Sequence, residues 1–346
     1  MKNKQKIKID KIPSVFKNIS FPKEVYISPK ILAGEGTILL VEAGNHEGKL
    51  NTLDFTNGRL GKLWQWDKIP AVLGYRKATT EFAGFVPSSI TVGDELYLLC
   101  ESGVIGEISG VFESWGRPMK VKVLGSILDK NGKCMNLKNF SLPPIKKIRT
   151  SIPLIVFLGT RMDSGKTTIA CKIAHEFKAM GKKIAALKLT GVAFSQDLMR
   201  LTDSGVSLAF DFTDMGLPST CNGSSSEIVN SALNLVAYTH REKPDFILVE
   251  FGDAVLGEYH VADILKNKIF KSQISVVILA ANDLAGVKGT KDILAQWGIE
   301  IDIVTGPIAN SKIGIDLIHK HFNIVGESNQ HNIPKTISLI RSRLFQ

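Results

Sequence analysis

The sequence contains no uninterrupted apolar run approaching the roughly 18 residues that suggest a membrane-spanning helix. Its first residues, Met1–Lys6, are rich in lysine and lack the apolar core of a secretory signal. The four cysteines, Cys100, Cys134, Cys171 and Cys221, lie far apart and form no C-x-x-C pair, which argues against a disulfide framework and a zinc site. These absences predict a soluble, cytoplasmic protein without a membrane span, whose cysteines are buried thiols.

The composition is that of a packed globular protein, with 44% hydrophobic and 22% charged residues. A chain of 346 residues is long enough for two domains. Residues 1–30 hold eight lysines against Asp10 and Glu24, which accounts for more than half of the net charge of +10. We interpret residues 1–24 as a basic N-terminal arm, a solvated tail, with weak binding to nucleic acid, a membrane surface or an acidic partner as the alternative.

Between residues 25 and 142, short runs of β-favouring residues are separated by glycines and polar turns. Examples are Thr37–Val41, Glu95–Leu99 and Met119–Leu124. Short strands at this spacing predict a smaller β-rich domain, folded as a barrel or a sandwich. Nothing in this half resembles a catalytic constellation.

A proline-bearing, basic stretch over residues 143–150 predicts a linker. From residue 151 to 346, apolar strand patterns alternate with helical patterns, which predicts an α/β domain whose parallel sheet carries helices on both faces. The carboxyl ends of parallel strands meet at one edge, where a ligand site is expected. The expected strands are Leu154–Leu158, Ile184–Leu189, Phe246–Val249, Ser275–Ala280 and Ile301–Val304.

The first of these strands runs directly into Gly159-Thr-Arg-Met-Asp-Ser-Gly-Lys-Thr-Thr168. A helix is expected to follow directly, because apolar residues recur at helical spacing, at Ile169, Ile173, Phe177 and Met180. Gly181 is expected to end this helix. The order of strand, loop and helix is the context in which a phosphate-binding loop (P-loop) can be trusted. Five residues separate Gly159 from Gly165, one more than in the usual pattern.

The chemistry of such a loop follows from its geometry. Successive backbone N–H groups and a helix N-terminus favour phosphate oxygens, Lys166 reaches the β- and γ-phosphates, and the Thr167 hydroxyl ligates Mg²⁺. We therefore expect the cofactors ATP, or GTP, and Mg²⁺. The nucleotide-binding residues expected in the loop are Gly159, Thr160, Arg161, Met162, Asp163, Ser164, Gly165, Lys166, Thr167 and Thr168.

Residues 152–325 resemble dethiobiotin synthetase and related proteins of the SIMIBI class of P-loop NTPases, which carry Gly-Thr-x-x-x-x-Gly-Lys-Thr with this spacing. The resemblance implies that Lys188, in Ala185–Gly191, faces phosphate and substrate. It implies that Glu250, which ends a strand before Phe-Gly, helps to hold Mg²⁺, and that Asn310, in Gly306-Pro-Ile-Ala-Asn310, reads the base.

Two departures from that family bear on function. Glu250-Phe-Gly-Asp253 lacks the glycine run that usually follows the glutamate, which leaves the second substrate open. In the related partition-ATPase loop the signature lysine falls at Arg161, so a guanidinium could approach phosphate from the same or a neighbouring subunit. The oligomeric state is open, with a homodimer as one alternative.

Magnesium requires hard oxygen ligands, usually one or two carboxylates besides the loop threonine. We expect Thr167, Glu250 and Asp211 to form the metal site. Asp203 and Asp214 are alternatives to Asp211, since Phe210–Thr220 is a polar stretch that could order around phosphate and metal as a switch segment. The sequence does not choose among these three aspartates.

Several other polar residues have a structural interpretation that outweighs a catalytic one. His260 with Tyr259 could transfer a proton, but a lone histidine is more often packed or solvated. Cys221 has no activating base nearby in sequence. Asn282-Asp283 only faintly resembles a guanine-reading motif. Ser224-x-x-Glu227 is typical of a helix start.

The sequence supports three functions. The first is an enzyme in which Lys166, Lys188 and Glu250 act in nucleotide hydrolysis or in γ-phosphoryl transfer to a small carboxylate-like metabolite, with ATP favoured. The second is a regulatory or cofactor-maturation NTPase that uses ATP or GTP and acts on a protein partner through the N-terminal domain. The third keeps the loop as an anchor for a structural nucleotide.

Overall fold

The computed structural model describes residues 5–45, 48–145 and 152–345, so part of the expected linker and the first four residues of the expected arm lie outside the described residues. Contacts divide the chain into two compact units. The barrel unit comprises the chain up to Pro143 together with residues 192–196 and 212–222. The P-loop unit comprises residues 144–191, 197–211 and 223–346. Two short segments of the C-terminal half therefore group with the N-terminal unit.

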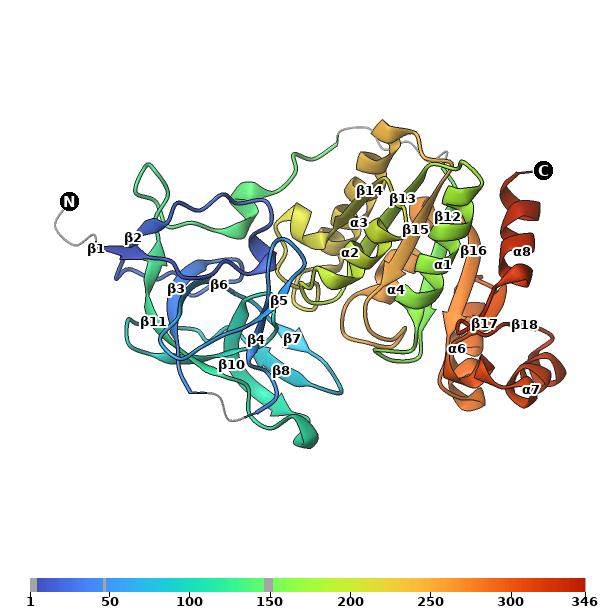
Figure 1. Cartoon of the computed structure of the whole chain (residues 1–346), viewed down its shortest axis with the longest axis horizontal. Coiled ribbons are helices and arrows are strands. Elements are labelled where there is room, and N and C mark those ends of the chain that lie inside the picture. The colour runs from blue at the N-terminus through green and yellow to red at the C-terminus, as the bar shows by residue number, and fades with distance from the viewer. Residues whose placement is uncertain (1–4, 46–47, 146–151, 346) are drawn as a thin grey trace. The chain divides into compact units, whose positions relative to one another are not determined.

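The barrel unit is built from strands with short 3₁₀ turns (Figure 1). Its strands are β1 Gln5–Lys8, β2 Glu24–Ser28, β3 Ile38–Ala43, β4 Thr52–Asp54, β5 Leu60–Lys62, β6 Lys68–Leu73, β7 Arg76–Lys77, β8 Phe82–Phe85, β9 Glu95–Leu98, β10 Val104–Val111 and β11 Lys120–Ile127. Its 3₁₀ turns are η1 Ser14–Phe16, η2 Glu113–Trp115, η3 Leu137–Phe140 and η4 Phe212–Met215.

Five of these strands pair with one another in a closed ring. β11 pairs with β3, β3 with β6, β6 with β10, β10 with β9, and β9 again with β11, so the pairing forms a ring. Closure removes the unpaired edges of these strands and encloses an apolar interior. The interior is lined by alternate strand residues such as Leu39, Val41, Ile69, Ala71 and Val121, each at most 1% exposed. The predicted β-rich domain is thus a barrel rather than a sandwich.

The described part of the expected N-terminal arm is folded, which differs from the solvated tail that its lysines suggested. β1 pairs antiparallel with β2, and Phe16 is fully buried against the barrel unit, with Val15 at 3% exposure. Lys6 pairs with Glu24 on the neighbouring strand. The buried apolar residues therefore decide the structure of this segment. Lys6 and Lys8 lie on the edge strand β1, where charge discourages further strand pairing.

The P-loop unit is a sheet of seven parallel strands in the order β14-β13-β15-β12-β16-β17-β18. The strands are β12 Leu154–Gly159, β13 Ile184–Thr190, β14 Leu208–Asp211, β15 Phe246–Phe251, β16 Ile274–Ala280, β17 Ile303–Thr305 and β18 Val325–Gly326. The helices are α1 Lys166–Ala179, α2 Gln196–Asp203, α3 Ser225–Thr239, α4 Val261–Lys266, α5 Lys268–Lys271, α6 Leu284–Gln296, α7 Lys312–Phe322 and α8 Pro334–Leu344, with 3₁₀ turns η5 His240–Glu242 and η6 Pro307–Asn310.

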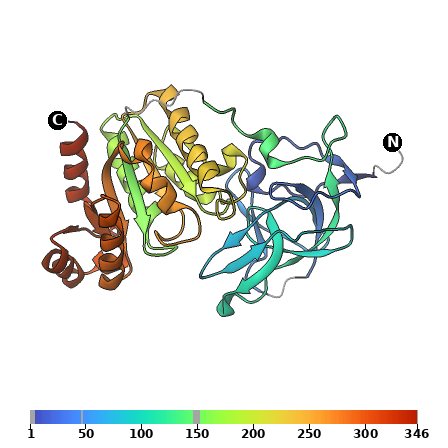
Figure 2. The same ribbon diagram turned by 180° about the vertical axis from the view of Figure 1, so that it is seen from behind.

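Helices cover both faces of this sheet. In Figure 1 the green α1 lies in front of the strands, and in Figure 2, from the opposite side, the yellow α3 lies in front of them. The predicted α/β fold with a parallel P-loop sheet is confirmed. Of its strands, β14 and β18 were not expected, because each is short and has little apolar periodicity.

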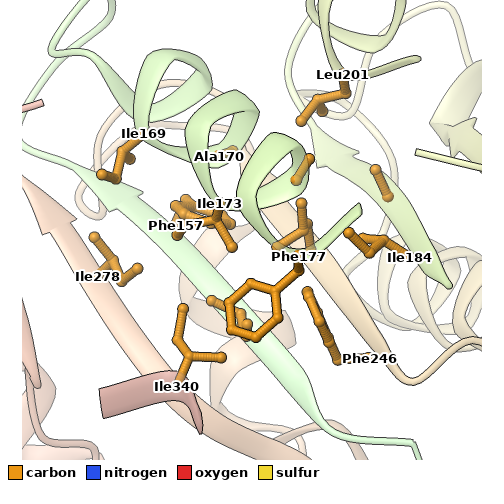
Figure 3. Close-up of a cluster of buried hydrophobic side chains, with 14 of the residues drawn as sticks. Phe157, Ile169, Ala170, Ile173, Phe177, Ile184, Leu201, Phe246, Ile278 and Ile340 are labelled. Carbon is orange, nitrogen blue, oxygen red and sulfur yellow. The ribbon is translucent and has the colours of Figure 1, made fainter. Parts of the chain in front are cut away.

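One face of the sheet packs against α1, α2 and α8 through a continuous apolar cluster. Figure 3 shows Ile169, Ile173 and Phe177 of α1 directed at the strands, with Phe177 beside Phe246 and Ile340. The Phe177 and Phe246 rings meet edge to face at 5.1 Å between centroids, a favourable aromatic geometry. Met180, expected on the same helical face, is 44% exposed because α1 ends at Ala179 and the chain turns at Gly181.

None of the helices in the described ranges is both long and apolar enough to cross a lipid bilayer.

Candidate functional site

The loop between β12 and α1 wraps tightly around its own polar groups. A Cβ atom at Gly159 would lie 2.6 Å from Lys166 Nζ and 2.9 Å from the Arg161 carbonyl oxygen, so a side chain there would collide with the loop. Gly165 has φ +99°, a backbone conformation that glycine adopts without strain, and it begins α1 without a side-chain cap. The helix therefore presents its first N–H groups and its positive dipole end to the interior of the loop.

Lys166 is the first residue of α1 and is 6% exposed. Its ammonium group lies 3.0 Å from the carbonyl oxygen of Arg161 and 3.4 Å from that of Asp253. Burial lowers the pKa of Lys166 below its usual range, an effect that the nearby Glu250 carboxylate partly offsets. A buried ammonium held by neutral carbonyl oxygens gains electrostatic stabilisation when an anion enters the loop.

Alternation along the strands explains why polar side chains gather at this edge of the sheet. Ile184 and Ala186 on β13, and Phe246 and Leu248 on β15, belong to the apolar cluster that faces α1. Two residues further along each strand, on the same face, come Lys188 and Glu250.

The strand register then sets Lys188 between two carboxylates. Lys188 is in register with Glu250 on one side and with Asp211, the last residue of β14, on the other. Glu250 is 4% exposed and Asp211 3%. All three predicted residues thus lie in one row of the parallel sheet, beside the beginning of α1.

Thr167 connects the loop to this row and to an aspartate that the sequence did not single out. Its hydroxyl donates to Glu250 Oε1 at 3.0 Å and lies 3.3 Å from Asp197 Oδ1. The other Asp197 oxygen forms an ion pair with Lys188. Asp197 lies in the first turn of α2, where an acid has a structural explanation through the helix dipole, so no sequence signal distinguished it.

The charges in this cluster perturb one another strongly. Burial, followed by the charge of Asp197, raises the pKa of Glu250 to about 7. For Asp197, burial acts to raise the pKa but the ion pair with Lys188 outweighs it, so the pKa is lowered. For Lys188, burial acts to lower the pKa but Asp197 and Glu250 outweigh it, so the pKa is raised. Perturbations of this kind, clustered at a sheet edge, are typical of functional sites.

Two buried oxygens at the loop have no hydrogen-bond partner among the described residues, Glu250 Oε2 and Ser164 Oγ. A buried carboxylate oxygen without a donor is costly unless a cation or a protonated group meets it. Carboxylate and hydroxyl oxygens are the donors that Mg²⁺ prefers, so Thr167, Glu250 and Asp197 fit that ion. No group of three or more His, Cys, Asp or Glu residues suited to a metal is found in the described chain, so the protein ligands here would be few.

The remaining loop residues differ in their surroundings. Thr160 Oγ1 accepts the backbone N–H of Asn282 at 3.2 Å, and Thr168 Oγ1 lies 3.4 Å from an Arg200 nitrogen. Asp163 is exposed with φ +54°. Arg161 is exposed, and its Nε donates to the neighbouring Met162 carbonyl at 3.1 Å.

Asn282 and Asn329 bond to the loop, and Asn310 bonds to Ser328, the residue before Asn329. Asn310 is exposed, and its Oδ1 accepts from Ser328 Oγ at 2.9 Å. Asn329, 2% exposed, donates through Nδ2 to the Gly165 carbonyl at 3.3 Å. Asn282 Oδ1 is buried and has no partner in the described chain. Sequence reasoning predicted Asn310 but missed Asn329, which follows the two-residue strand β18 and carries no local signal.

The two alternative aspartates lie elsewhere. Asp203 is exposed at the opposite end of α2 from Asp197, about 9 Å along the helix at 1.5 Å per residue. Asp214 belongs to the barrel unit and accepts from Lys17 Nζ at 2.7 Å and Asn18 Nδ2 at 2.8 Å.

The contacts and burial of the other candidate catalytic residues favour structural roles. His260 Nδ1 lies 2.6 Å from Asp263 Oδ2, and Tyr259 is 2% exposed. Burial raises the pKa of Cys221 to about 11, which disfavours the thiolate that a nucleophile needs. Ser224 caps α3 by accepting from the Glu227 N–H at 3.2 Å, which confirms the predicted helix start.

No family model matches this chain. No curated protein matches it either.

Three solved structures illustrate the similarity that is found. The signal recognition particle receptor FtsY from Elizabethkingia anophelis, in complex with GDP, is similar at a TM-score of 0.38 and 17% identity, over 58% of this chain and 66% of that one. The cell division protein FtsY from Thermotoga maritima reaches 0.37 and 16%, over 62% and 80%. A nucleotide-binding protein from Archaeoglobus fulgidus, in complex with ADP, reaches 0.37 and 14%, over 50% and 79%.

Proposed function

We propose that this chain is a Mg²⁺-dependent P-loop NTPase of the SIMIBI class, with ATP as the favoured nucleotide. The observation that carries the proposal is the buried cluster at the N-terminus of α1. There Lys166, Thr167, Lys188, Asp197 and Glu250 converge, and one carboxylate oxygen of Glu250 has no partner among the described residues.

Each residue has a role that its position supports. The backbone of the loop and the uncapped start of α1 bind the phosphates. Lys166 exchanges its carbonyl partners for phosphate oxygens and neutralises the charge that develops on them. Thr167, Glu250 and Asp197 would hold the metal, with Asp211, in register with Lys188, as the alternative carboxylate. The metal would screen the phosphate charges. Lys188 remains fixed by Asp197, so that its charge faces the same space.

We further propose that the γ-phosphoryl group passes either to water or to a small carboxylate-like metabolite, as in dethiobiotin synthetase. Lys166 and Lys188 provide two buried positive charges at one sheet edge, which suits the neutralisation of both phosphate and an acidic acceptor. The loop after Glu250 lacks the glycine run of that family, so the acceptor is expected to differ from the family's own substrate.

The proposal is tested by nucleotide hydrolysis with and without Mg²⁺, comparing wild type with Lys166→Ala and Lys178→Ala. Lys178 lies on the same helix but is exposed, and serves as the matched control. We expect Mg²⁺-dependent hydrolysis that Lys166→Ala abolishes and Lys178→Ala preserves. Equal hydrolysis by the two variants would contradict the proposal. Stimulation by a panel of small carboxylic acids then distinguishes transfer from hydrolysis.

One observation favours a second function, a regulatory or cofactor-maturation NTPase that uses ATP or GTP and acts on a protein partner. Residues 192–196 and 212–222 follow the site strands β13 and β14 in sequence, yet they group with the barrel unit. A barrel in contact with these segments suits a role in which the nucleotide state controls partner docking. Partner binding that is identical with ATP, with ADP and without nucleotide would remove this function.

A further inference from the structure

Asp54 lies at the end of β4 in the barrel unit and is fully buried. Both of its carboxylate oxygens are saturated by donors from that unit. Oδ2 accepts from the Ser195 N–H at 2.7 Å and from Ser14 Oγ at 2.5 Å, and Oδ1 accepts from Ser195 Oγ at 2.8 Å and Gln196 Nε2 at 2.7 Å. A buried carboxylate with four donors is a fixed acceptor rather than a reactive group.

Three of these four donors belong to Ser195 and Gln196, which directly precede Asp197. Gln196 also donates to the Gly58 carbonyl oxygen at 2.8 Å, so its side chain is held at two points. Consecutive Cα atoms are about 3.8 Å apart, so fixing the backbone at Ser195 and the side chain of Gln196 restricts where the next residue can lie.

The next residue, Asp197, contacts the proposed nucleotide site. It forms the ion pair with Lys188 and lies within hydrogen-bond distance of the Thr167 hydroxyl. All contacts of Asp54 named here lie inside the barrel unit, and these contacts of Asp197 lie inside the P-loop unit. The peptide bond between Gln196 and Asp197 therefore connects the contacts of Asp54 with the contacts of Asp197.

A second segment has the same arrangement. Asp211, in register with Lys188, ends β14, and the chain then enters the barrel unit over residues 212–222. Three residues after Asp211, the Asp214 carboxylate is held by Lys17 and Asn18. Both segments that follow the site residues of β13 and β14 are thus held by side chains from the N-terminal half of the chain.

We propose that Asp54 is a positioning residue for the metal ligand Asp197, so that the barrel unit sets the magnesium affinity of the site. This inference rests on the proposed function. Asp54 does not touch the nucleotide or the metal. It fixes Ser195 and Gln196, and through them the start of α2 and the Asp197 carboxylate. Coupling is reciprocal, so magnesium and nucleotide at Asp197 also stabilise the Asp54 network.

The test compares Asp54→Asn with Asp129→Asn in the full chain. Asp129 also accepts backbone N–H groups, from Asn131 and Lys133, but in an exposed turn of the barrel unit, and is the matched control. Ser195→Ala removes a single donor and serves as a milder variant if Asp54→Asn does not fold. The first readout is hydrogen exchange of the α2 amides in the ligand-free protein. The second is the Mg²⁺ concentration that half-saturates binding of a fluorescent nucleotide.

We expect α2 amides to exchange about tenfold faster in Asp54→Asn and unchanged in Asp129→Asn. Half-saturation by Mg²⁺ should rise about tenfold, the lower end of what outer contacts contribute to metal affinity, while nucleotide binding without Mg²⁺ stays constant. In the background of Asp197→Asn, the Asp54→Asn change should have no further effect on the Mg²⁺ requirement, since both act through one ligand.

Unchanged α2 exchange in both Asp54→Asn and Ser195→Ala would overturn the inference, and so would additive effects of Asp54→Asn and Asp197→Asn on the Mg²⁺ requirement. A wild-type protein that shows no Mg²⁺-dependent nucleotide binding would overturn the proposed function instead. The exchange readout needs no ligand, so it still decides whether Asp54 holds α2 in place.

Discussion

Two buried carboxylates, one in each unit, have opposite surroundings. Asp54 of the barrel unit accepts four hydrogen bonds, two on each oxygen. Glu250 of the P-loop unit is 4% exposed, yet it accepts one hydrogen bond, from Thr167, and its second oxygen has no partner among the described residues. Asp54 and Glu250 are both buried, so they differ in the number of hydrogen bonds that their carboxylate oxygens accept and not in burial.

This difference in accepted hydrogen bonds indicates which carboxylate has all of its partners within the protein and which needs a ligand. Asp54 is fully satisfied by its own unit, which suits a structural acceptor. Glu250 is left with an unmatched oxygen and a pKa raised by burial, which suits a group that gains its partner from solution. The edge of the parallel sheet is therefore suited to ligand binding, and the barrel unit to positioning.

The largest effect is expected from substitution of the loop lysine, Lys166, which tests whether ligand binding belongs to the P-loop unit. Lys166→Ala removes a buried ammonium whose present partners are neutral carbonyl oxygens, so it should lower nucleotide hydrolysis about 10²- to 10³-fold, the usual loss for a preorganised charge-stabilising donor. Steady-state phosphate release measures the effect. A loss under about threefold would show that the loop does not serve catalysis.

The next largest effect is expected at Asp197, in the first turn of α2. Asp197→Asn abolishes the ion pair with Lys188 and replaces a proposed carboxylate ligand of the metal by a neutral amide, so hydrolysis should fall about 10- to 100-fold and the Mg²⁺ requirement should rise. Asp203→Asn, on the same helix but exposed at its other end, should leave both unchanged. Mg²⁺ titrations of both variants measure the difference, and equal effects would contradict the placement of the site.

A third test is the pH dependence of stability in the Mg²⁺-free protein. The pKa of Glu250 is raised from 4.5 to about 7, so the folded state keeps a proton that the unfolded state loses. The resulting stabilisation is fully present below about pH 4.5 and is lost as the pH rises through about 7. Asp197 has a lowered pKa, so its own contribution changes below about 3.8, outside this window.

Urea unfolding at several pH values between about 5 and 8 measures this slope. Glu250→Gln has no titrating group at the position, so its stability should depend less on pH over this range than that of wild type. Identical slopes for the two proteins would show that Glu250 is already ionised when buried. Added Mg²⁺ should restore stability to wild type above pH 7 and have little effect on the variant, since the ion competes with the proton.

The smallest effect is expected at Arg161. Its side chain is exposed and donates to the carbonyl of the adjacent Met162, so Arg161→Ala should change hydrolysis by no more than about threefold. A much larger loss that depends on protein concentration would instead indicate that Arg161 acts on the nucleotide of a neighbouring subunit. Measuring specific activity across a dilution series separates these outcomes.

Much of the P-loop unit was predictable because its signals are local. The loop carries a glycine where a side chain would collide with Lys166, and the buried strands are apolar runs. Lys188 and Glu250 were located through the resemblance to dethiobiotin synthetase, and both lie near the carboxyl ends of neighbouring parallel strands, which share one edge. Because the strand signals are local apolar runs, the bounds predicted for five strands of the parallel sheet agree with the structure to within about two residues.

The rest depends on contacts between residues distant in sequence. Asp197 looks like an ordinary acid in the first turn of a helix until β13 brings Lys188 to it. Asp54 and Ser195 are 141 positions apart, so nothing local connects them. The basic N-terminal residues suggested a solvated tail because their charge is conspicuous, whereas Phe16 and Val15, two buried side chains, determine that the segment is folded.

The most direct test of the central claim is calorimetric titration of ATP and GTP into the full chain with and without Mg²⁺, repeated with Glu250→Gln. The account predicts nucleotide binding that Mg²⁺ strengthens at least about tenfold in wild type, and a Mg²⁺ effect that is largely lost in Glu250→Gln while binding without Mg²⁺ persists. Nucleotide binding that Mg²⁺ does not alter, or an equal Mg²⁺ effect in wild type and Glu250→Gln, would contradict it.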